Sequence, residues 1–401
     1  MEVFPTEHEG RRMILVHDPA GLARGVLTVT EPALFILSKF DGQHTLQEIQ
    51  DDFRQVFGQR VSMEQLEDLA AQLDEQLFLD SPRFDEYVAR SEREFNEAPT
   101  RQTQPDSGFG VELHQLPIAL REIVGEPKPA PDGGRLVALI APHLDLRRGR
   151  ECYAEAYRLL GAANHAERFV ILGTNHFGRS ASVVATRKPF ETPLGTAPAD
   201  GEFLERLNRR CGVDLCERQY DHKREHSVEI QVLFLQYLMY RRPFRIVPAL
   251  CPDPCGPTGT APIDGRGVDL RTFAEVLGDE IAADPVPTCI IAGADLSHVG
   301  RRFGDDCELT ESFLKQVEQT DREALGHIEA NEPEAFRRFL AETQNRTRVC
   351  SAGSIHALMT ALNRAYGRDR LSTRVLRYHQ AVDKAAHTCV TCAAVAFTLK
   401  E

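Results

Sequence analysis

The chain of 401 residues has no tryptophan, only five methionines, and no long apolar run. A membrane-spanning helix needs roughly 18 or more consecutive apolar residues, so we expect no membrane segment. The first residues, MEVFPTEHEGRR, lack the charged-then-apolar order of a secretory signal. Together these absences predict a cytoplasmic protein.

The chain is also short of positive charge. It has 47 Lys and Arg residues against 60 Asp and Glu residues, a formal net charge of −13. Because a nucleic-acid backbone needs a basic protein surface, this balance argues against nucleic acid as a partner. The length leaves room for two or three domains, and a hydrophobic content of 42% suffices for a large core.

Cysteine is better represented, with ten residues. A long chain without an export signal keeps its thiols reduced, so we expect no disulfides. Cys389 and Cys392 form a CxxC inside an apolar stretch that predicts a strand. Residues three apart on a strand face opposite sides of the sheet, and this pair is therefore not expected to chelate a metal.

Three separate apolar runs each end at a histidine or an aspartate. LVALIAPHLDL reaches His143, FVILGTNHFG reaches His176, and CIIAGADLSHVG reaches Asp295 and His298. Short Val, Ile, Leu and Ala runs closed by Gly or Pro predict buried strands of a largely parallel sheet with helices on both faces. Because ligands of open α/β sheets bind beyond the carboxyl ends of the strands, these side chains should meet at one metal or catalytic centre.

The patterns of hydrophobicity divide the chain into three regions. Residues 1–80 hold a strand, GVLTVT, and three amphipathic helices, two of them preceded by capping-box sequences at Thr45 and Ser62, which predicts a small winged-helix-like domain. Residues 81–133 form a connector with a charged helical stretch and Pro- and Gly-rich segments. Residues 134–401 alternate strand and helix, which is typical of an α/β sheet domain.

The predicted first domain has the helices expected of a DNA-binding unit but not the charge. Residues 1–80 contain six Lys and Arg against fifteen Asp and Glu, the wrong sign for phosphate. The order of its elements, with an acidic-Gly turn before TLQEI and a closing QLFL, resembles the PqqD-like peptide-recognition modules. That resemblance implies a peptide or protein partner, bound along a strand edge. A packing domain without a ligand is the alternative.

Six motifs in residues 135–400 resemble a known family when taken in order: APHLDL, ILGTNHFG, ETPLGTAPAD, REHSVEIQVLFLQYL, GADLSHVG and VCSAGSIHAL. They resemble the MEMO family, called system protein B of the AmmeMemoRadiSam group in bacteria and archaea. The resemblance implies an α/β fold similar to LigB-type class III extradiol dioxygenases and a site for iron or copper. The metal ligands that it implies here are His143, His176 and Cys350. Lining the same pocket, as catalytic candidates, would be Asp295, His298 and His226.

The chemistry of these residue types supports part of the implied site. Two neutral imidazoles and a thiolate suit copper, iron or zinc and leave a coordination position open. Iron oxygenases usually have two histidines and a carboxylate, so Asp295 is an alternative third ligand, with Cys350 outside the metal's reach. Cys350 precedes a predicted helix whose dipole would favour the thiolate.

The three catalytic candidates each have an expected role. Asp295 and His298 are expected in a loop between a strand and a helix, as an acid–base or orienting pair near the metal. A helix N-cap is the structural alternative for Asp295. His226 is expected to open a long apolar helix, where a neutral imidazole would act as general base or orient the substrate.

Metal-dependent redox chemistry on an unidentified substrate is the function that the sequence favours. A non-catalytic adaptor that works with a radical SAM enzyme and an AMMECR1-like partner is an alternative of a different class. A hydrolase that uses a metal-bound water is another. The identity of the metal separates them, because iron or copper favours oxidation and zinc favours hydrolysis.

Overall fold

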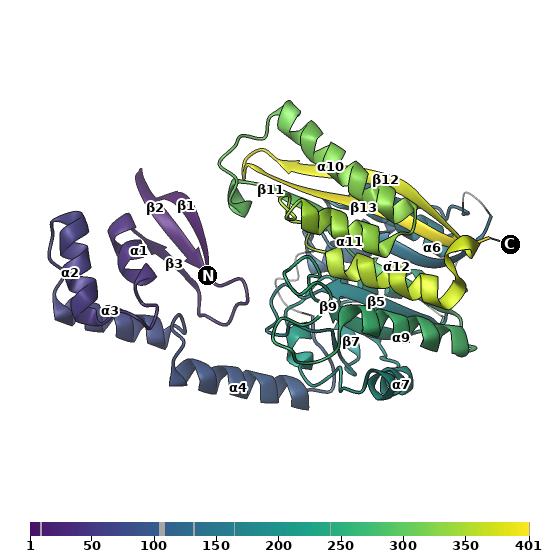
Figure 1. Ribbon diagram of the computed structural model, residues 1–401, viewed down its shortest axis with the longest axis horizontal. Helices are drawn as coiled ribbons and strands as arrows, with labels where there is room; N and C mark the ends of the chain where they lie inside the picture. The colour runs from purple at the N-terminus through teal and green to yellow at the C-terminus, as the bar shows by residue number, and fades with distance from the viewer. Residues whose placement is uncertain (9, 104–108, 131–132, 164, 241, 401) are drawn as a thin grey trace. The chain divides into compact units, whose positions relative to one another are not determined.

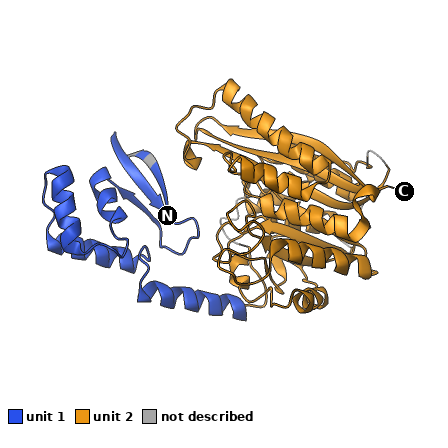
Figure 2. Cartoon of the chain, viewed as in Figure 1, with its two compact units in different colours: residues 1–97 blue, residues 98–401 orange. Residues whose placement is uncertain are grey.

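The computed structural model describes residues 1–8, 10–103, 109–130, 133–163, 165–240 and 242–400. The chain folds into two compact units, Met1–Glu97 and Ala98–Glu401 (Figure 2). The described residues include no helix that is long and apolar enough to span a membrane. All ten cysteines are free thiols, as expected.

The connector that we expected at residues 81–133 is divided between the two units. Its charged stretch forms helix α4 (Pro82–Glu97), which closes the first unit. Residues from Ala98 onward belong to the second unit, because they pack against its strands and turns. Residues 104–108 and 131–132, in the predicted Pro- and Gly-rich segments, lie outside the described residues.

The first unit combines an antiparallel sheet with helices. The predicted strand is β3 (Val26–Val29), and β1 (Glu2–His8) and β2 (Arg11–His17) extend the sheet in the order β1-β2-β3. The sequence did not predict β1 and β2, because charged residues and a proline interrupt any alternation of apolar and polar side chains there.

The helices of the first unit follow the sequence pattern closely. They are α1 (Glu31–Ser38), α2 (Leu46–Phe57) and α3 (Met63–Glu75). Thr45 and Ser62 each form the predicted capping box with the residue three positions on. The apolar faces of the helices meet in a small core formed by Ile36, Ile49, Phe53 and Leu66.

The second unit is built on a mixed sheet, whose described strands run in the order β11-β13-β4-β10-β5-β9-β6, with β12 beside β13. The parallel strands at its centre are β4 (Arg135–Ala141), β10 (Thr288–Gly293), β5 (Arg168–Thr174) and β9 (Arg245–Cys251). The antiparallel strands are β11 (Asp295–Gly300), β13 (Thr388–Leu399), β12 (Leu371–Asp383) and β6 (Val184–Ala185).

The prediction of a largely parallel sheet is thus correct for the central strands and wrong for the outer ones. β13 explains the error. Every residue of β13 is buried, and a strand that is buried on both faces has an unbroken apolar run like that of a parallel strand. Its residues Cys389 and Cys392 pack into different apolar clusters, as expected for opposite faces.

Helices cover both faces of this sheet (Figure 1). On one face lie α7 (Gly201–Cys211), α9 (Leu270–Ala283), α10 (Glu311–Glu329), α11 (Pro333–Glu342) and α12 (Ala352–Tyr366). On the other lie α5 (Leu116–Val124), α6 (Arg150–Ala163) and α8 (Glu229–Leu238), and a hairpin of β7 (Phe190–Thr192) and β8 (Gly195–Ala197). Alternate residues of each central strand therefore face one apolar core or the other.

The parallel strands place the chemically important side chains at one edge. β4 ends at Ala141, β5 at Thr174 and β10 at Gly293. The next polar candidates, His143, His176 and Asp295, each follow two residues later. Because the carboxyl ends of parallel strands share an edge of the sheet, the fold brings these three residues together.

Helix α12 packs closely over the same edge, and one glycine makes this possible. A Cβ on Gly353 would overlap the carbonyl oxygen of Pro252, which directly follows β9.

We expect Gly353→Ala to lower the free energy of unfolding by about 1–3 kcal/mol, measured by denaturant titration. The control is Gly326→Ala in α10, where a Cβ meets nothing within 4 Å and the change should stabilise by about 0.5–1 kcal/mol. Equal effects of the two substitutions would contradict the close packing.

Candidate metal centre

The three expected metal ligands meet at this edge. One ligand atom from each of His143, His176 and Cys350 lies within 4.8 Å of the other two. The Nε2 atom of His143 is 3.5 Å from the Cys350 sulfur, and the two imidazole rings are 4.9 Å apart and nearly perpendicular, at 81°. Two nitrogens and a sulfur thus surround one position.

His143 is held in a fixed orientation. Its Nδ1 atom lies 3.0 Å from the carbonyl oxygen of Gly293, and because a carbonyl only accepts, Nδ1 keeps its proton, so that the neutral form of the ring presents its lone pair at Nε2. Gln231 donates to the carbonyl of Pro142 at 2.7 Å and Tyr153 donates to that of Leu144 at 2.6 Å. The turn around the imidazole is therefore fixed on both sides.

His176 is oriented by a carboxylate that the sequence did not identify. Its Nδ1 atom lies 3.0 Å from the buried carboxylate of Glu225, which also accepts from the backbone N–H of His176 at 2.9 Å and of Ser227 at 2.8 Å. Burial alone would lower the pKa of His176, but the Glu225 carboxylate raises it well above its usual value. A carboxylate behind a histidine in this way fixes the ring and strengthens it as a metal ligand.

We expect Glu225→Gln to weaken metal binding by about 10–100-fold. The amide can still orient the His176 ring, but it lacks the negative charge that makes the imidazole a stronger metal ligand. Competition with a chelator of known affinity measures the effect. Glu217→Gln, at an exposed position, is the matched control. Unchanged affinity in the Glu225 variant would mean that the carboxylate serves only to hold the turn.

Cys350 lies just before α12 and is partly buried, with its sulfur 3.2 Å from the hydroxyl of Ser351. Burial alone would raise its pKa, but the rings of His143 and His298 hold the pKa of Cys350 well below the usual value. For His143, burial lowers the pKa, while Asp295 and Cys350 raise it to about 9. The site therefore favours a thiolate beside an imidazolium, and a bound cation would take the place of the imidazolium proton.

Asp295 and His298 lie on strand β11, not in the loop that we expected. Their spacing of three residues is typical of an irregular loop, but the segment pairs with β13, with a β-bulge between the two residues. The strand also excludes the N-cap alternative for Asp295. Its buried carboxylate is 3.5 Å from Nε2 of His143. His298 turns its Nδ1 to the carbonyls of Leu296 at 3.1 Å and Arg348 at 3.2 Å, which leaves Nε2 available.

His226 completes the cluster. It lies in the turn before α8, not inside the helix as expected, because α8 begins at Glu229. Its ring is 5.4 Å from that of His143 and stacks on that of His176 at 5.6 Å. Burial holds the pKa of His226 down at about 4, so the ring is neutral. Together with His176 and Glu225 it forms a second group that could hold a metal ion.

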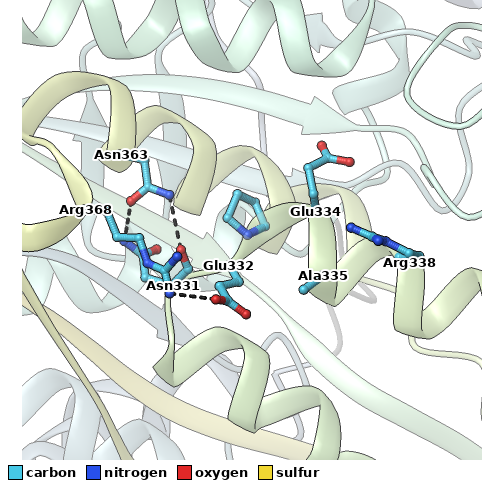
Figure 3. A pocket seen from close by; sticks show the side chains of 8 residues that line it. Asn331, Glu332, Glu334, Ala335, Arg338, Asn363 and Arg368 are labelled. Atoms are coloured by element: carbon cyan, nitrogen blue, oxygen red, sulfur yellow. Dashed lines mark hydrogen bonds and ion pairs between the residues drawn. The ribbon is translucent and has the colours of Figure 1, made fainter.

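A surface pocket elsewhere lacks these features. It has a volume of about 390 Å³ and is shown in Figure 3, lined by Asn331, Glu332, Pro333, Glu334, Ala335, Arg338, Asn363 and Arg368. Several of its polar groups pair with one another: Arg368 contacts Glu332 at 2.7 Å and Asn363 donates to the carbonyl of Asn331 at 3.2 Å. The described lining contains none of the clustered histidines or Cys350.

Comparison with known proteins supports the family resemblance. A MEMO1 family protein of Aquifex aeolicus is 26% identical over 337 residues, 84% of this chain and 83% of the relative. One of Thermus thermophilus is 28% identical over 81% of this chain and 92% of its own. The memo-1 homolog of Caenorhabditis elegans is 28% identical over 57% of this chain and 61% of its own. A solved structure of an uncharacterized protein from Escherichia coli K12 has 13% identity, a TM-score of 0.37, and covers 65% of this chain and 99% of that chain.

The two bacterial alignments are longer than the second unit, residues 98–401, so each extends into the first unit. These relatives therefore share more with the chain than the sheet domain. The family model described as Memo-like protein matches residues 112–397, which include all of the clustered side chains. The chain belongs to the Memo-like family.

Proposed function

We propose that the chain binds one iron or copper ion through His143, His176 and Cys350 and carries out redox chemistry on a small substrate. The observation that supports this most strongly is the orientation of the two imidazoles. Each has its Nδ1 engaged by an acceptor, so that each has Nε2 available as a ligand. Nitrogen and thiolate ligands suit iron, copper or zinc.

A metal with these three ligands keeps at least one open position, where it would supply redox or Lewis-acid chemistry to a bound substrate. The neighbouring side chains would handle protons and orientation. Asp295 is buried beside His143, and burial raises the pKa of its carboxyl group. His298 turns its Nδ1 to two backbone carbonyls, and the neutral ring of His226 can orient a substrate by hydrogen bonding.

Reconstitution of the full chain with different metals tests this function. The protein is loaded anaerobically with Fe(II), Cu(I) or Zn(II), and dioxygen consumption is then followed with ascorbate or a small thiol as reductant. We expect consumption by the iron or copper form and none by the zinc form. Ester hydrolysis by the zinc form alone would favour the hydrolase. Failure to bind any of the three would favour the adaptor.

We also propose that the first unit binds a peptide or protein partner, as its resemblance to PqqD-like modules implies. The support is the strand order β1-β2-β3, in which β1 and β3 are the edge strands of the described sheet. An extended peptide can add to such an edge. Calorimetry of the full chain with a purified AMMECR1-like protein and with a radical SAM protein tests the expected partners, and absence of heat with both would contradict them.

A further inference from the structure

The segment that follows the first unit places an arginine inside the second. The Arg101 side chain is fully buried. Its backbone N–H donates to the carbonyl of Pro189 at 2.8 Å, and its own carbonyl accepts from Glu191 at 2.9 Å. Its guanidinium lies 5.2 Å from the ring centre of Phe190. A buried cation is costly unless it is paired and hydrogen-bonded, so its partners indicate its role.

Among the described residues, the hydrogen-bonding and charged partners of this guanidinium lie in residues 222–229. Nε donates to the carbonyl of His222 at 3.1 Å, and Nη2 donates to the carbonyl of Glu225 at 2.8 Å. Nη1 pairs with the carboxylate of Glu229 at 2.7 Å, where neither side chain is exposed. Arg101 thus fixes both ends of the turn that precedes α8. The planar guanidinium suits this task, because it donates in several fixed directions at once.

The same turn supports the candidate metal centre. The backbone carbonyl of Glu225 accepts from Arg101, while the Glu225 carboxylate accepts from Nδ1 and the backbone N–H of His176. A displaced Glu225 would therefore turn the His176 ring. His226 is the next residue and stacks on the same ring. A continuous set of hydrogen bonds leads from Arg101 to an expected metal ligand.

We propose that Arg101 is a positioning residue of the metal centre, which sets the Glu225–His226 turn and, through Glu225, the orientation of His176. Arg101 does not belong to the cluster and would not touch a metal or a substrate there. Its effect on the centre acts through the turn. The proposal rests on the proposed metal function. It means that the segment after α4, which contains Arg101, positions the turn before α8 and is more than a linker.

Cobalt binding to the full chain tests this role. Co(II) reports both affinity, by competition with a chelator, and ligand geometry, by its visible spectrum. The key variant is Arg101→Met with Glu229→Gln, which removes the buried cation together with the charge of the carboxylate that it pairs with. We expect it to fold, to bind Co(II) about 10–100-fold more weakly, the range for partners of metal ligands, and to have a shifted spectrum.

Two further variants keep the test decisive. Arg101→Lys retains the charge but not the planar set of donors, so it should show the same loss if the double variant does not fold. Arg168→Lys is the control matched to Arg101→Lys, because Arg168 is also buried and paired, with Asp200 at 2.8 Å, but starts β5 at the end opposite His176. It should lower stability and leave the spectrum of bound Co(II) unchanged.

The outcomes separate this proposal from the proposed function. Wild-type affinity and spectrum in the folded Arg101 variants would overturn the positioning role alone. A wild-type protein that binds no Co(II) would overturn the metal function, and the positioning role with it. Weakened binding with a spectral shift in the Arg101 variants, but not in the Arg168 control, is the result that we expect.

Discussion

Each of the variants His143→Ala, His176→Ala and Cys350→Ser is expected to bind metal more than about 100-fold more weakly than the wild type. Loss of a residue that merely orients a ligand costs about 10–100-fold, so loss of a ligand should cost more. Serine at position 350 removes the thiolate, which is the softest donor of the set. Chelator competition under anaerobic conditions measures all three affinities.

Asp295→Asn is the control for this series. The Asp295 carboxylate is 3.5 Å from Nε2 of His143, which keeps it as the alternative third ligand. We expect the asparagine variant to lose no affinity at pH 7, since Asp295 lies outside the group whose ligand atoms are within 4.8 Å of one another. If Cys350→Ser keeps the metal while Asp295→Asn loses it, the assignment of the third ligand is wrong.

Proton competition at His143 alone is expected to raise metal affinity by about 50-fold between pH 7 and pH 9. The imidazolium form of His143 must lose a proton before Nε2 can bind a metal. Burial lowers the pKa of His143, but Asp295 and Cys350 raise it to about 9. Below that pH, proton competition reduces the affinity about tenfold per pH unit. Because the pKa of Cys350 lies well below its usual value, the thiolate adds no comparable dependence in this range.

Chelator competition at pH 6, 7, 8 and 9 checks the sign and the slope. The Asp295→Asn variant should give a flatter profile, because removal of the carboxylate lowers the pKa of His143. A further steepening from His176 is expected, since Glu225 also raises the pKa of that ring. An affinity that is independent of pH in the wild type would contradict the imidazolium–thiolate pair.

The sequence predicted four of the six candidate residues from the ends of apolar runs alone. His143, His176 and Asp295 each follow a parallel strand by two residues, so one rule places them together. Cys350 follows no strand. It precedes α12, which packs against the strands from one face, and only the family motif linked Cys350 to the histidines.

The supporting residues could not be predicted from the sequence. Glu225 orients a histidine that lies 49 residues earlier, and Arg101 reaches a carbonyl 124 residues later. Local sequence patterns carry no information on contacts between residues so far apart in the chain. An acidic residue such as Glu225, just before α8, is explained equally well by the favourable interaction of a carboxylate with the helix dipole. A buried arginine is unexpected for a polar segment between two domains, because charged residues are rarely buried unless paired.

The errors in the fold of the second unit have a physical cause that differs from the one in the first. Capping boxes and helix periodicity depend on neighbouring residues, and the helices of the first unit were predicted correctly. Strand direction depends on pairing across the chain. β13 forms a local antiparallel hairpin with β12, but its place beside β4 and β11 depends on residues more than 85 positions away in sequence, and its uniform burial gives no sign of its direction. β11, where we expected a loop, likewise pairs with this distant strand.

The most direct test of the central claim is elemental analysis of the wild-type protein purified without oxygen. We predict close to one iron or copper ion per chain, and its loss from His143→Ala and His176→Ala. Stoichiometric zinc in place of iron or copper would favour a metal-dependent hydrolase over a redox enzyme. No bound metal in the wild type, even after reconstitution, would contradict the account and leave a partner-binding protein as the better description.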